Sequence, residues 1–363
     1  MTEKILHITW DMGVGGKEKA LIQLIKGQRQ AGREADLLVS SQINAYEDEL
    51  KKTHTRVYAL GQRSGSDFFV RKKFLEIIKD YSLLHFHGPD HVLLPIVSRK
   101  RSHKLFYTHR SGLHPYPLSR KVKYKIAGHF IRKYFNGISA NSRHAALVAS
   151  RLFHLPIKKI IITYNGVDFS LLIPSRSKEE ILKELGEKET DVIRIGTSAN
   201  LRKWKRIDYL LKAAFALKGL PIRCYIIGDG PSRAWLEKLS QELGVSEIVT
   251  FTGRKFHVEN YLQLLDIFIL PSGQEESFGN SAVEAMSLGI PTIVMGDGGG
   301  LMEHISEGMG LIARTPEDIP GIIRKLAESE NLRKSMGEKC KEFVRKKYTI
   351  KKMIEAYERL YLQ

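Results

Sequence analysis

Two carboxylates, Glu276 and Glu284, are separated by the seven residues S-F-G-N-S-A-V. A carboxylate only accepts hydrogen bonds, and it can hold a vicinal diol with two of them. In a helix that begins near Gly279 and rises about 1.5 Å per residue, Glu284 would lie one to two turns inside while Glu276 stays beside the first turn. A nucleoside diphosphate sugar, with a diol on each side of its diphosphate, would satisfy this layout.

The helix start between these carboxylates predicts an anion site. Ile267–Leu270 and Pro291–Met295 read as buried strands, and the helix between them would end at Gly289. Parallel sheets hold ligands at the carboxyl ends of their strands, and the unpaired N–H groups at a helix start favour a phosphate. The expected N–H donors are Phe278, Gly279, Asn280 and Ser281.

The longer string E-x-F-G-x-x-x-x-E-A resembles the signature of the retaining family-4 glycosyltransferases. The resemblance implies that Glu276 holds hydroxyls of the transferred sugar and Glu284 the ribose diol, with the base near the backbone of Arg254. The alternative is a loop charge at Glu276 and a solvated helix residue at Glu284. The match over the longer string makes that alternative the weaker hypothesis.

Two further motifs match the family in the first half of the chain. G-G-x-E follows the strand Ile5–Thr9, and there the family closes on the donor diphosphate, which implies the same role for Gly15 and Gly16. A loop after Leu105–Thr108 places His109 where the family has a histidine against the transferred sugar. A purely structural glycine turn and a capped structural histidine remain the alternatives.

The start of the second half departs from the family pattern. The family usually has R-L-x-x-x-K, whose arginine and lysine both reach the diphosphate. Lys205 matches the lysine, but Asn200 occupies the position of the arginine and cannot neutralise a phosphate. Arg202 or Arg206 could supply the missing cation, or the site works with one. A solvated lysine in a basic cluster is the alternative for Lys205.

No metal or other cofactor is expected. His85 and His87 in H-F-H-G could supply two metal ligands, but no third ligand follows at a suitable distance and the chain has no D-x-D motif. Cys224 and Cys340 lack the spacing of a zinc site, and two cysteines make no disulfide framework.

Alternating strands and helices run through both halves of the 363 residues. With the resemblance, they imply an α/β protein of GT-B type: two Rossmann-like domains facing across a cleft, with the C-terminal helix returning to the first. The acceptor-side domain would span 1–170 and about 345–363, and the nucleotide-sugar domain 171–344. The polar, proline-interrupted segment 171–190 is interpreted as a linker.

The net charge of +18 is concentrated in the first half. Residues 1–170 hold 29 Lys and Arg against 13 Asp and Glu, and no acid occurs between Asp90 and Asp168. Such a surface attracts phosphates, whether on a lipid, a nucleic acid or a phosphorylated substrate. The helix expected at Leu118–Phe135 carries Val122, Ile126, Phe130 and Tyr134, which either face the core or sit on anionic lipid.

The sequence therefore predicts a metal-independent, retaining hexosyltransferase that uses a nucleotide sugar. The expected acceptor is a lipid-linked or phosphate-bearing glycan intermediate of cell-envelope polysaccharide. With no secretion signal and no apolar run of about 20 residues, we expect a cytoplasmic protein, peripheral on the cytoplasmic face of an anionic membrane. A sugar-nucleotide epimerase or phosphorylase on the same fold is the alternative. A nucleic-acid binder is less favoured, because no RNA or DNA motif occurs. Sugar, base, acceptor and oligomeric state stay open.

Overall fold

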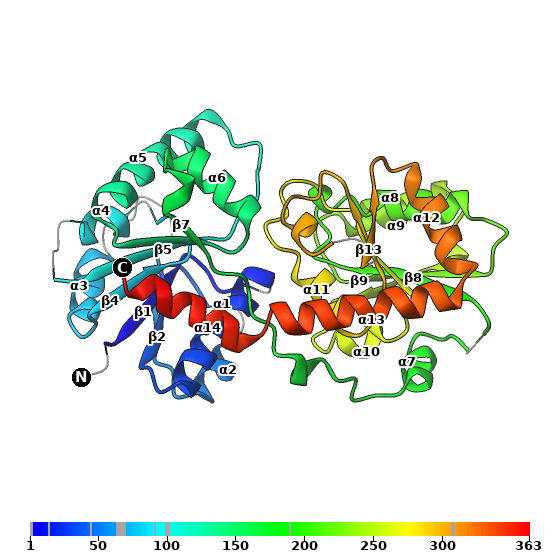
Figure 1. The fold of residues 1–363 in the computed structure, drawn as a ribbon, viewed down its shortest axis with the longest axis horizontal. Coiled ribbons are helices and arrows are strands. Elements are labelled where there is room, and N and C mark those ends of the chain that lie inside the picture. The colour runs from blue at the N-terminus through cyan, green and yellow to red at the C-terminus, as the bar shows by residue number, and fades with distance from the viewer. Residues whose placement is uncertain are drawn as a thin grey trace. The chain divides into compact units, whose positions relative to one another are not determined.

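The computed structural model describes residues 3–13, 15–43, 46–62, 70–90, 92–98, 102–188, 190–305 and 309–363. The chain forms two compact units, one made of 1–167 with 350–363 and the other of 168–349. Each unit is built on a parallel sheet of its own, as expected (Figure 1). The predicted α/β class and the two Rossmann-like domains are confirmed.

The first unit has a seven-stranded sheet in the order β3-β2-β1-β4-β5-β6-β7. Its strands are β1 (Ile5–Thr9), β2 (Ala35–Val39), β3 (Val57–Ala59), β4 (Leu83–Phe86), β5 (Lys104–His109), β6 (Gly137–Ala140) and β7 (Ile160–Ile162). From β1 the chain moves outward to β3 and then returns to the other side of β1 at β4. The direction of strand addition therefore reverses between β1 and β4.

Helices cover both faces of this sheet. On one face lie α1 (Gly16–Gln30), α2 (Glu47–Lys51) and the C-terminal α14 (Ile350–Tyr361); on the other lie α3 (Arg71–Ile78), α4 (Leu93–Val97), α5 (Leu118–Tyr134) and α6 (Arg143–Phe153). Figure 1 shows α14 beside α1. The predicted return of the C-terminal helix to the first domain is confirmed, and its Met353, Tyr357 and Leu360 are buried in that core.

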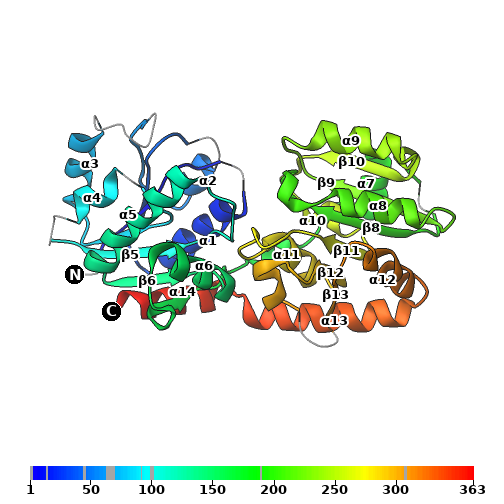
Figure 2. The ribbon, with the colours of Figure 1, turned by 90° about the horizontal axis from the view of Figure 1, so that it is seen from above.

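The second unit has a six-stranded sheet in the order β10-β9-β8-β11-β12-β13, which can be followed in Figure 2. Its strands are β8 (Ile193–Ser198), β9 (Ile222–Ile227), β10 (Val249–Gly253), β11 (Ile267–Leu270), β12 (Thr292–Met295) and β13 (Gly310–Ala313). Here the direction of strand addition reverses between β8 and β11. The expected strands around the carboxylate pair correspond to β11 and β12.

Two helical layers cover this second sheet. One contains α7 (Lys178–Glu184), α10 (Glu259–Leu262) and α11 (Asn280–Ser287); the other contains α8 (Asp208–Ala216), α9 (Arg233–Glu242) and α12 (Asp318–Ala327), and α13 (Glu330–Lys347) precedes α14. The 3-10 helices are η1 (Ile157–Lys159), η2 (Phe169–Leu172), η3 (Lys203–Lys205), η4 (Ser246–Ile248) and η5 (Gly299–Glu303).

The segment 171–190 is not a simple linker. Ser177 and Glu180 form a reciprocal capping box that begins α7. Beyond that helix, Glu187 accepts hydrogen bonds from the hydroxyl groups of Tyr225 (2.5 Å) and Thr250 (2.8 Å). These contacts fix the segment onto β9 and β10, so it belongs to the second unit.

Candidate active site

The carboxyl ends of β8 and β11 are the place in the second unit where a ligand is expected. The two strands are neighbours, and the chain leaves them in opposite directions across the sheet. Open parallel sheets bind ligands at this kind of reversal. The loop after β8 contains Asn200 and Lys205, and the loop after β11 runs from Pro271 to Gly279. The topology thus brings the two predicted donor-binding segments to one edge.

Lys205 and Glu276 form an ion pair across these loops. The Lys205 Nζ lies 2.5 Å from a Glu276 carboxylate oxygen and 4.4 Å from the centre of the Trp204 ring. Their side chains are only 12% and 10% exposed, which excludes a solvated lysine and a free loop charge. Both charged groups are therefore largely removed from solvent.

A buried contact fixes the start of α11. Gly279 immediately precedes the helix with φ = +81°, and a Cβ there would lie 2.2 Å from Leu301 Cδ2, so only glycine fits. The buried Phe278 carbonyl accepts a 2.5 Å hydrogen bond from His304 Nε2. The Tyr348 hydroxyl lies 2.7 Å from His304 Nδ1. Burial lowers the pKa of His304 to about 4, so the ring stays neutral at pH 7 and keeps the proton that it donates.

The remaining predicted residues on α11 lie in its first two turns. Asn280 and Ser281 are half-buried in the first turn, where the leading N–H groups of a helix have no intrahelical acceptor. Glu284 follows one turn later and is 6% exposed. That burial contradicts the alternative of a solvated helix residue.

Arg206 is the better placed of the two arginines near Asn200. Its guanidinium packs over Gly273 in the loop after β11, where a Cβ would meet Arg206 Nη2 at 2.5 Å, and it donates a 2.8 Å hydrogen bond to Asp297. Arg202 is exposed. Arg206 is therefore the candidate for the cation that is missing at Asn200.

Several buried polar atoms at this edge have no hydrogen-bond partner among the described residues. They are Thr197 Oγ1, Asn200 Oδ1, Ser272 Oγ and Glu275 Oε2. Buried polar groups without partners are rare and need an explanation, and here they flank the ends of β8 and β11. Hydroxyl groups can donate to a phosphate, and the amide and carboxylate oxygens can accept from sugar hydroxyls. Thr197, Ser272 and Glu275 were missed from the sequence, because nothing in their local pattern distinguishes them.

Arg254 follows β10 and is exposed. The backbones of Gly228, after β9, and Gly253, before Arg254, form a bridge with a 2.9 Å N–H···O bond. This bridge holds the backbone of the Arg254 loop at the same carboxyl edge of the sheet.

In the first unit, His109 is the last residue of β5 and is 2% exposed. The Tyr107 hydroxyl lies 3.2 Å from its Nδ1, while its Nε2 is buried without a hydrogen-bond partner among the described residues. Burial lowers the pKa of His109 to about 4, so the ring is neutral at pH 7. A lone capped histidine would have both nitrogens satisfied, and this one has an unused nitrogen.

The predicted glycine turn lies at the start of α1. Gly15 precedes the helix, Gly16 is its first residue, and a Cβ on Gly15 would lie 2.5 Å from a Glu18 carboxylate oxygen. Lys17 forms salt bridges of 3.1 Å with both Asp11 and Glu18. The turn therefore combines close backbone packing with a lysine that is held by two acids.

His7 joins His85 and His87 inside the first unit, so the expectation that they lack a third ligand is wrong. One nitrogen from each ring lies within 4.8 Å of the others. The cluster nevertheless does not fit a metal. His7 is bonded to His87 at 2.9 Å and to Gln28 at 2.7 Å, and the Arg110 guanidinium lies 3.4 Å from the other nitrogen of His87.

The remaining ring of this cluster is bonded on both sides as well. His85 Nδ1 lies 2.8 Å from the Tyr361 hydroxyl and its Nε2 lies 2.7 Å from Thr108 Oγ1. Burial lowers the pKa values of His85 and His87 well below 6.5 and that of His7 to about 4. The three histidines thus form a neutral hydrogen-bonded cluster.

Comparison with known sequences covers nearly the whole chain in two parts. Residues 14–171 match the family described as Glycosyltransferase Family 4, and residues 177–343 match the group described as Glycosyl transferases group 1. The chain belongs to glycosyltransferase family 4. The resemblance first seen around Glu276 and Glu284 is confirmed.

Curated relatives of this family 4 chain align with part of it. The N-acetyl-alpha-D-glucosaminyl L-malate synthase of Bacillus anthracis is 30% identical over 210 residues, which is 57% of this chain and 54% of the relative. The lipopolysaccharide core biosynthesis glycosyltransferase LpsD of Rhizobium meliloti is 30% identical over 135 residues, 37% of this chain and 39% of the relative. The chain spans about half the length of the curated relatives it matches, or less.

Solved structures match over the full length. Anabaena HepE in complex with UDP-glucose superposes with a TM-score of 0.87 at 21% identity, covering 99% of this chain and 100% of that one. A glycosyltransferase from Rickettsia africae has a TM-score of 0.83 at 18% identity, covering 99% and 98%. At these identities the similarity establishes the GT-B fold of this family 4 chain.

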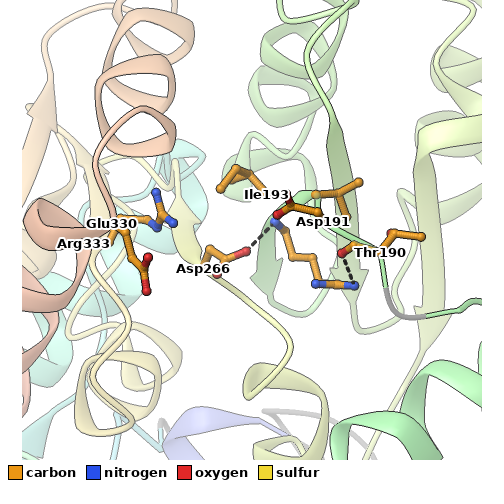
Figure 3. Close-up of a pocket in the computed structure, with 8 residues that line it drawn as sticks. Thr190, Asp191, Ile193, Asp266, Glu330 and Arg333 are labelled. Atoms are coloured by element: carbon orange, nitrogen blue, oxygen red, sulfur yellow. Dashed lines mark hydrogen bonds between the residues drawn. The ribbon is translucent and has the colours of Figure 1, made fainter.

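A separate pocket of about 470 Å³ lies at the other end of the second sheet. Its lining includes Arg194 in β8, and Figure 3 shows Asp191 before β8, Asp266 before β11 and Glu330 at the start of α13. The Arg194 backbone N–H donates to Asp266 at 2.7 Å, and its guanidinium donates to the Thr190 carbonyl at 3.3 Å. Parallel sheets hold ligands at the opposite ends of their strands, so this pocket is not the donor site of the family.

Proposed function

We propose that this family 4 chain transfers a glycosyl group from a nucleoside diphosphate sugar to a hydroxyl acceptor, with retention at the anomeric carbon and without a metal ion. The observation that carries the proposal is the largely buried Lys205–Glu276 ion pair, which joins the loops after β8 and β11 beside the start of α11. In this proposal Lys205 would contact the leaving diphosphate, and Glu276 beside it would contact the sugar.

The main chemical difficulty is the departure of a diphosphate from a carbon that becomes cationic. Lys205 and the N–H groups at the start of α11 would stabilise the charge that grows on the leaving phosphate. A preorganised donor of this kind contributes about 3 kcal/mol in a transition state. On donor binding, a phosphate would replace Glu276 as the partner of Lys205, and the released carboxylate would accept hydrogen bonds from the sugar hydroxyls.

The other predicted residues keep their proposed roles within each unit. Glu284 would hold the ribose diol from inside α11, and the backbone beside Arg254 would contact the base. In the first unit, Gly15 and Gly16 would approach the diphosphate and His109 the transferred sugar. Because His109 is neutral at pH 7, it would act by hydrogen bonding through its unused Nε2.

The proposed transfer takes place on one face of the sugar. The bond between the anomeric carbon and the phosphate oxygen breaks, the acceptor oxygen bonds to the same carbon, and the acceptor proton passes to the departing phosphate. This route needs no protein base. It agrees with the low pKa of His109, which makes that ring a weak base at neutral pH.

For the donor and acceptor, the comparisons suggest where to begin. HepE of Anabaena binds UDP-glucose, so UDP sugars are the first probes for this chain. The proposed acceptor is a lipid-linked or phosphate-bearing glycan of the cell envelope, reached from the cytoplasmic face of an anionic membrane. The basic first half of the chain supports this choice, as does similarity to a lipopolysaccharide core glycosyltransferase.

The test is a donor screen that measures nucleotide release with and without EDTA, followed by NMR assignment of the anomeric configuration in the product. We expect release from a nucleoside diphosphate sugar that EDTA does not abolish, and a product with the configuration of the donor. Conversion of the donor sugar without an acceptor would favour an epimerase. Release that depends on inorganic phosphate would favour a phosphorylase.

A further inference from the structure

Helix α5 exposes a stripe of aliphatic side chains. Leu118, Val122 and Ile126 are 78%, 50% and 54% exposed. Their spacing of four residues places them on one side of the helix, directly above one another. A stripe of this kind costs solvation free energy in water, because nothing in the described chain covers it.

The stripe is not the side by which α5 packs on its own unit. The buried residues of the helix are Ala127, Gly128 and Ile131, and a Cβ on Gly128 would lie 2.8 Å from the backbone of Phe153 in α6. The expectation that Val122, Ile126, Phe130 and Tyr134 could face the core is therefore wrong for Val122, Ile126 and Tyr134, which are exposed.

Helix α5 carries many cations in addition to the aliphatic stripe. Residues 118–134 contain six Lys and Arg and no acid, and the nearest acids in the sequence are Asp90 and Asp168. The six are all exposed: Arg120, Lys121, Lys123, Lys125, Arg132 and Lys133. The stripe with these six cations is called the α5 surface below.

The neighbouring helix α6 repeats the same combination. Leu147 is 45% exposed, and Arg143 and Arg151 lie four residues before and after it on the same side of the helix. Helices α5 and α6 pack against each other within the first unit. The basic and apolar character therefore extends beyond a single helix.

We infer that the α5 surface docks on an anionic lipid bilayer, with Leu118, Val122 and Ile126 entering the boundary between headgroups and acyl chains. Lipid phosphates would contact the surrounding lysines and arginines. A nucleic-acid backbone would match the cations but offers no hydrocarbon to the aliphatic stripe, so a bilayer accounts for both features. Among the helices that the structure describes, none has the length and hydropathy to cross a bilayer.

This inference identifies the surface of the protein that would contact the membrane in the proposed function. It rests on that function only for the statement that the acceptor is reached at the membrane. The docking itself depends on the exposed residues of the first unit, whereas donor binding is assigned to the second.

The test is co-sedimentation of the full chain with phosphatidylglycerol–phosphatidylcholine vesicles and with phosphatidylcholine vesicles, each at 0.1 M and 1 M NaCl. We expect binding to the anionic vesicles at 0.1 M and at least tenfold weaker binding at 1 M, where the Debye length shrinks to about 3 Å. Changing Leu118, Val122 and Ile126 to Ser should weaken binding to anionic vesicles at least tenfold. Changing Lys121, Lys123, Lys125 and Lys133 to Glu should abolish it.

Matched controls lie in the second unit. Phe215→Ser removes a side chain that is 48% exposed, and changing the exposed Lys178, Lys238, Lys325 and Lys334 to Glu gives the same change of net charge. Both controls should bind vesicles within twofold of wild type. Equal loss in the controls would overturn the inference, as would no binding to anionic vesicles or equal binding to neutral ones.

A UDP titration of every variant separates this result from the proposed function. We expect the α5 variants to bind UDP as wild type does, which also shows that they are folded. Vesicle binding without affinity for any nucleoside diphosphate would contradict the proposed function and leave the inference standing. Nucleotide binding without vesicle binding would do the reverse.

Discussion

The Lys205–Glu276 pair holds opposite charges in a setting where each side chain is about a tenth exposed. We predict that Lys205→Ala lowers the unfolding free energy by about 1 to 3 kcal/mol, because it leaves a carboxylate unpaired in a largely buried place. Glu276→Gln should cost about 1 kcal/mol or less, since the amide oxygen can still accept from the ammonium group.

Both substitutions should also lower glycosyl transfer at least tenfold, because each removes a proposed contact to the donor. Calorimetric melting beside initial rates measures the two effects. Lys203→Ala is the control, since this exposed lysine lies in the same turn η3 and should leave both quantities unchanged. A Lys205→Ala protein with wild-type transfer would remove the cation from the proposed site.

Arg206 and Arg202 should differ in their importance for nucleotide binding. Arg206→Ala should weaken binding of a nucleoside diphosphate by about 1 to 3 kcal/mol, the contribution of a charge-assisted hydrogen bond. Arg202→Ala should have no effect, because its side chain is exposed while Arg206 packs over Gly273. Isothermal titration calorimetry with UDP measures the affinity of each variant. Wild-type affinity for UDP in both variants would indicate a site with Lys205 as its only cation.

At the scale of elements, Gly279 and Gly289 lie at the two ends of α11, and both have a left-handed backbone conformation. Substituting each by alanine distinguishes the cost of backbone strain from the cost of a steric clash. Gly289→Ala should cost about 1 kcal/mol from its φ of +79° alone, since its Cβ would have no neighbour nearer than 3.8 Å. Gly279→Ala should cost about 2 to 4 kcal/mol, because a Cβ at φ = +81° would also meet Leu301 Cδ2 at 2.2 Å.

The same pair tests whether the start of α11 serves the donor. Urea unfolding gives the stability of the two variants, and a UDP titration gives their affinity. Affinity should fall in Gly279→Ala and stay near wild type in Gly289→Ala, which lies at the far end of the helix. Similar losses of affinity in both would argue against a donor phosphate at the start of α11.

Local pattern was enough to predict the elements around the carboxylate pair. The apolar runs at β11 and β12 and the glycines at both ends of α11 are signals within a few residues of each other, and the structure places them as expected. The prediction of a linker over the short α7 rests on Pro174 and on the many charged residues of the segment 171–190. Its capping box, Ser177 and Glu180, was the available signal.

Contacts between distant segments could not be predicted in this way. His7 lies beside His87 across 80 residues of sequence, and Arg206 reaches Asp297 across 91. Periodicity on α5 identified an amphipathic helix but not which side faces the core, since its small residues Ala127 and Gly128 do the packing. The sequence therefore indicated the residues that are proposed to bind the donor, but not that Lys205 and Glu276 would form an ion pair.

At the scale of the whole molecule, buried neutral histidines make stability depend on pH. The pKa values of His7, His109 and His304 are lowered by burial from 6.5 to about 4. Between these values the unfolded chain binds protons that the folded chain does not, so the unfolding free energy falls as the pH drops from about 6.5 towards 4. Each such histidine contributes about 1.4 kcal/mol per pH unit within that window.

The loss should be larger in the first unit, which contains His7 and His109 together with His85 and His87, than in the second, which contains His304. Differential scanning calorimetry from pH 7 to pH 5 measures it. The carboxylates contribute mainly below this range; the pKa of Glu184, for example, is lowered to about 2 by its hydrogen bonds with Lys255, Tyr261 and Arg176. Melting that is unchanged between pH 7 and 5 would contradict the prediction.

The hydrogen bonds of the histidine cluster also run in one donor-to-acceptor direction. A guanidinium can only donate, so Arg110 requires His87 to accept at Nδ1 and to carry its proton on Nε2. That proton faces His7 Nδ1, which places the His7 proton on Nε2, towards the Gln28 carbonyl oxygen. The Gln28 amide nitrogen then donates to the Tyr361 hydroxyl at 3.2 Å.

The series of hydrogen bonds continues from Tyr361 back to β5. With its oxygen accepting from Gln28, Tyr361 gives its own proton to His85 Nδ1, and His85 Nε2–H donates to Thr108, two residues before Arg110. One arginine thus selects the tautomer of three imidazoles and the rotamer of a tyrosine in the last turn of α14. The donors in this series of hydrogen bonds all point in the same direction along it. One added proton on any of the three imidazoles would place two donors opposite each other. It would break a hydrogen bond in the series that connects Tyr361 of α14 to β5, the strand that contains His109.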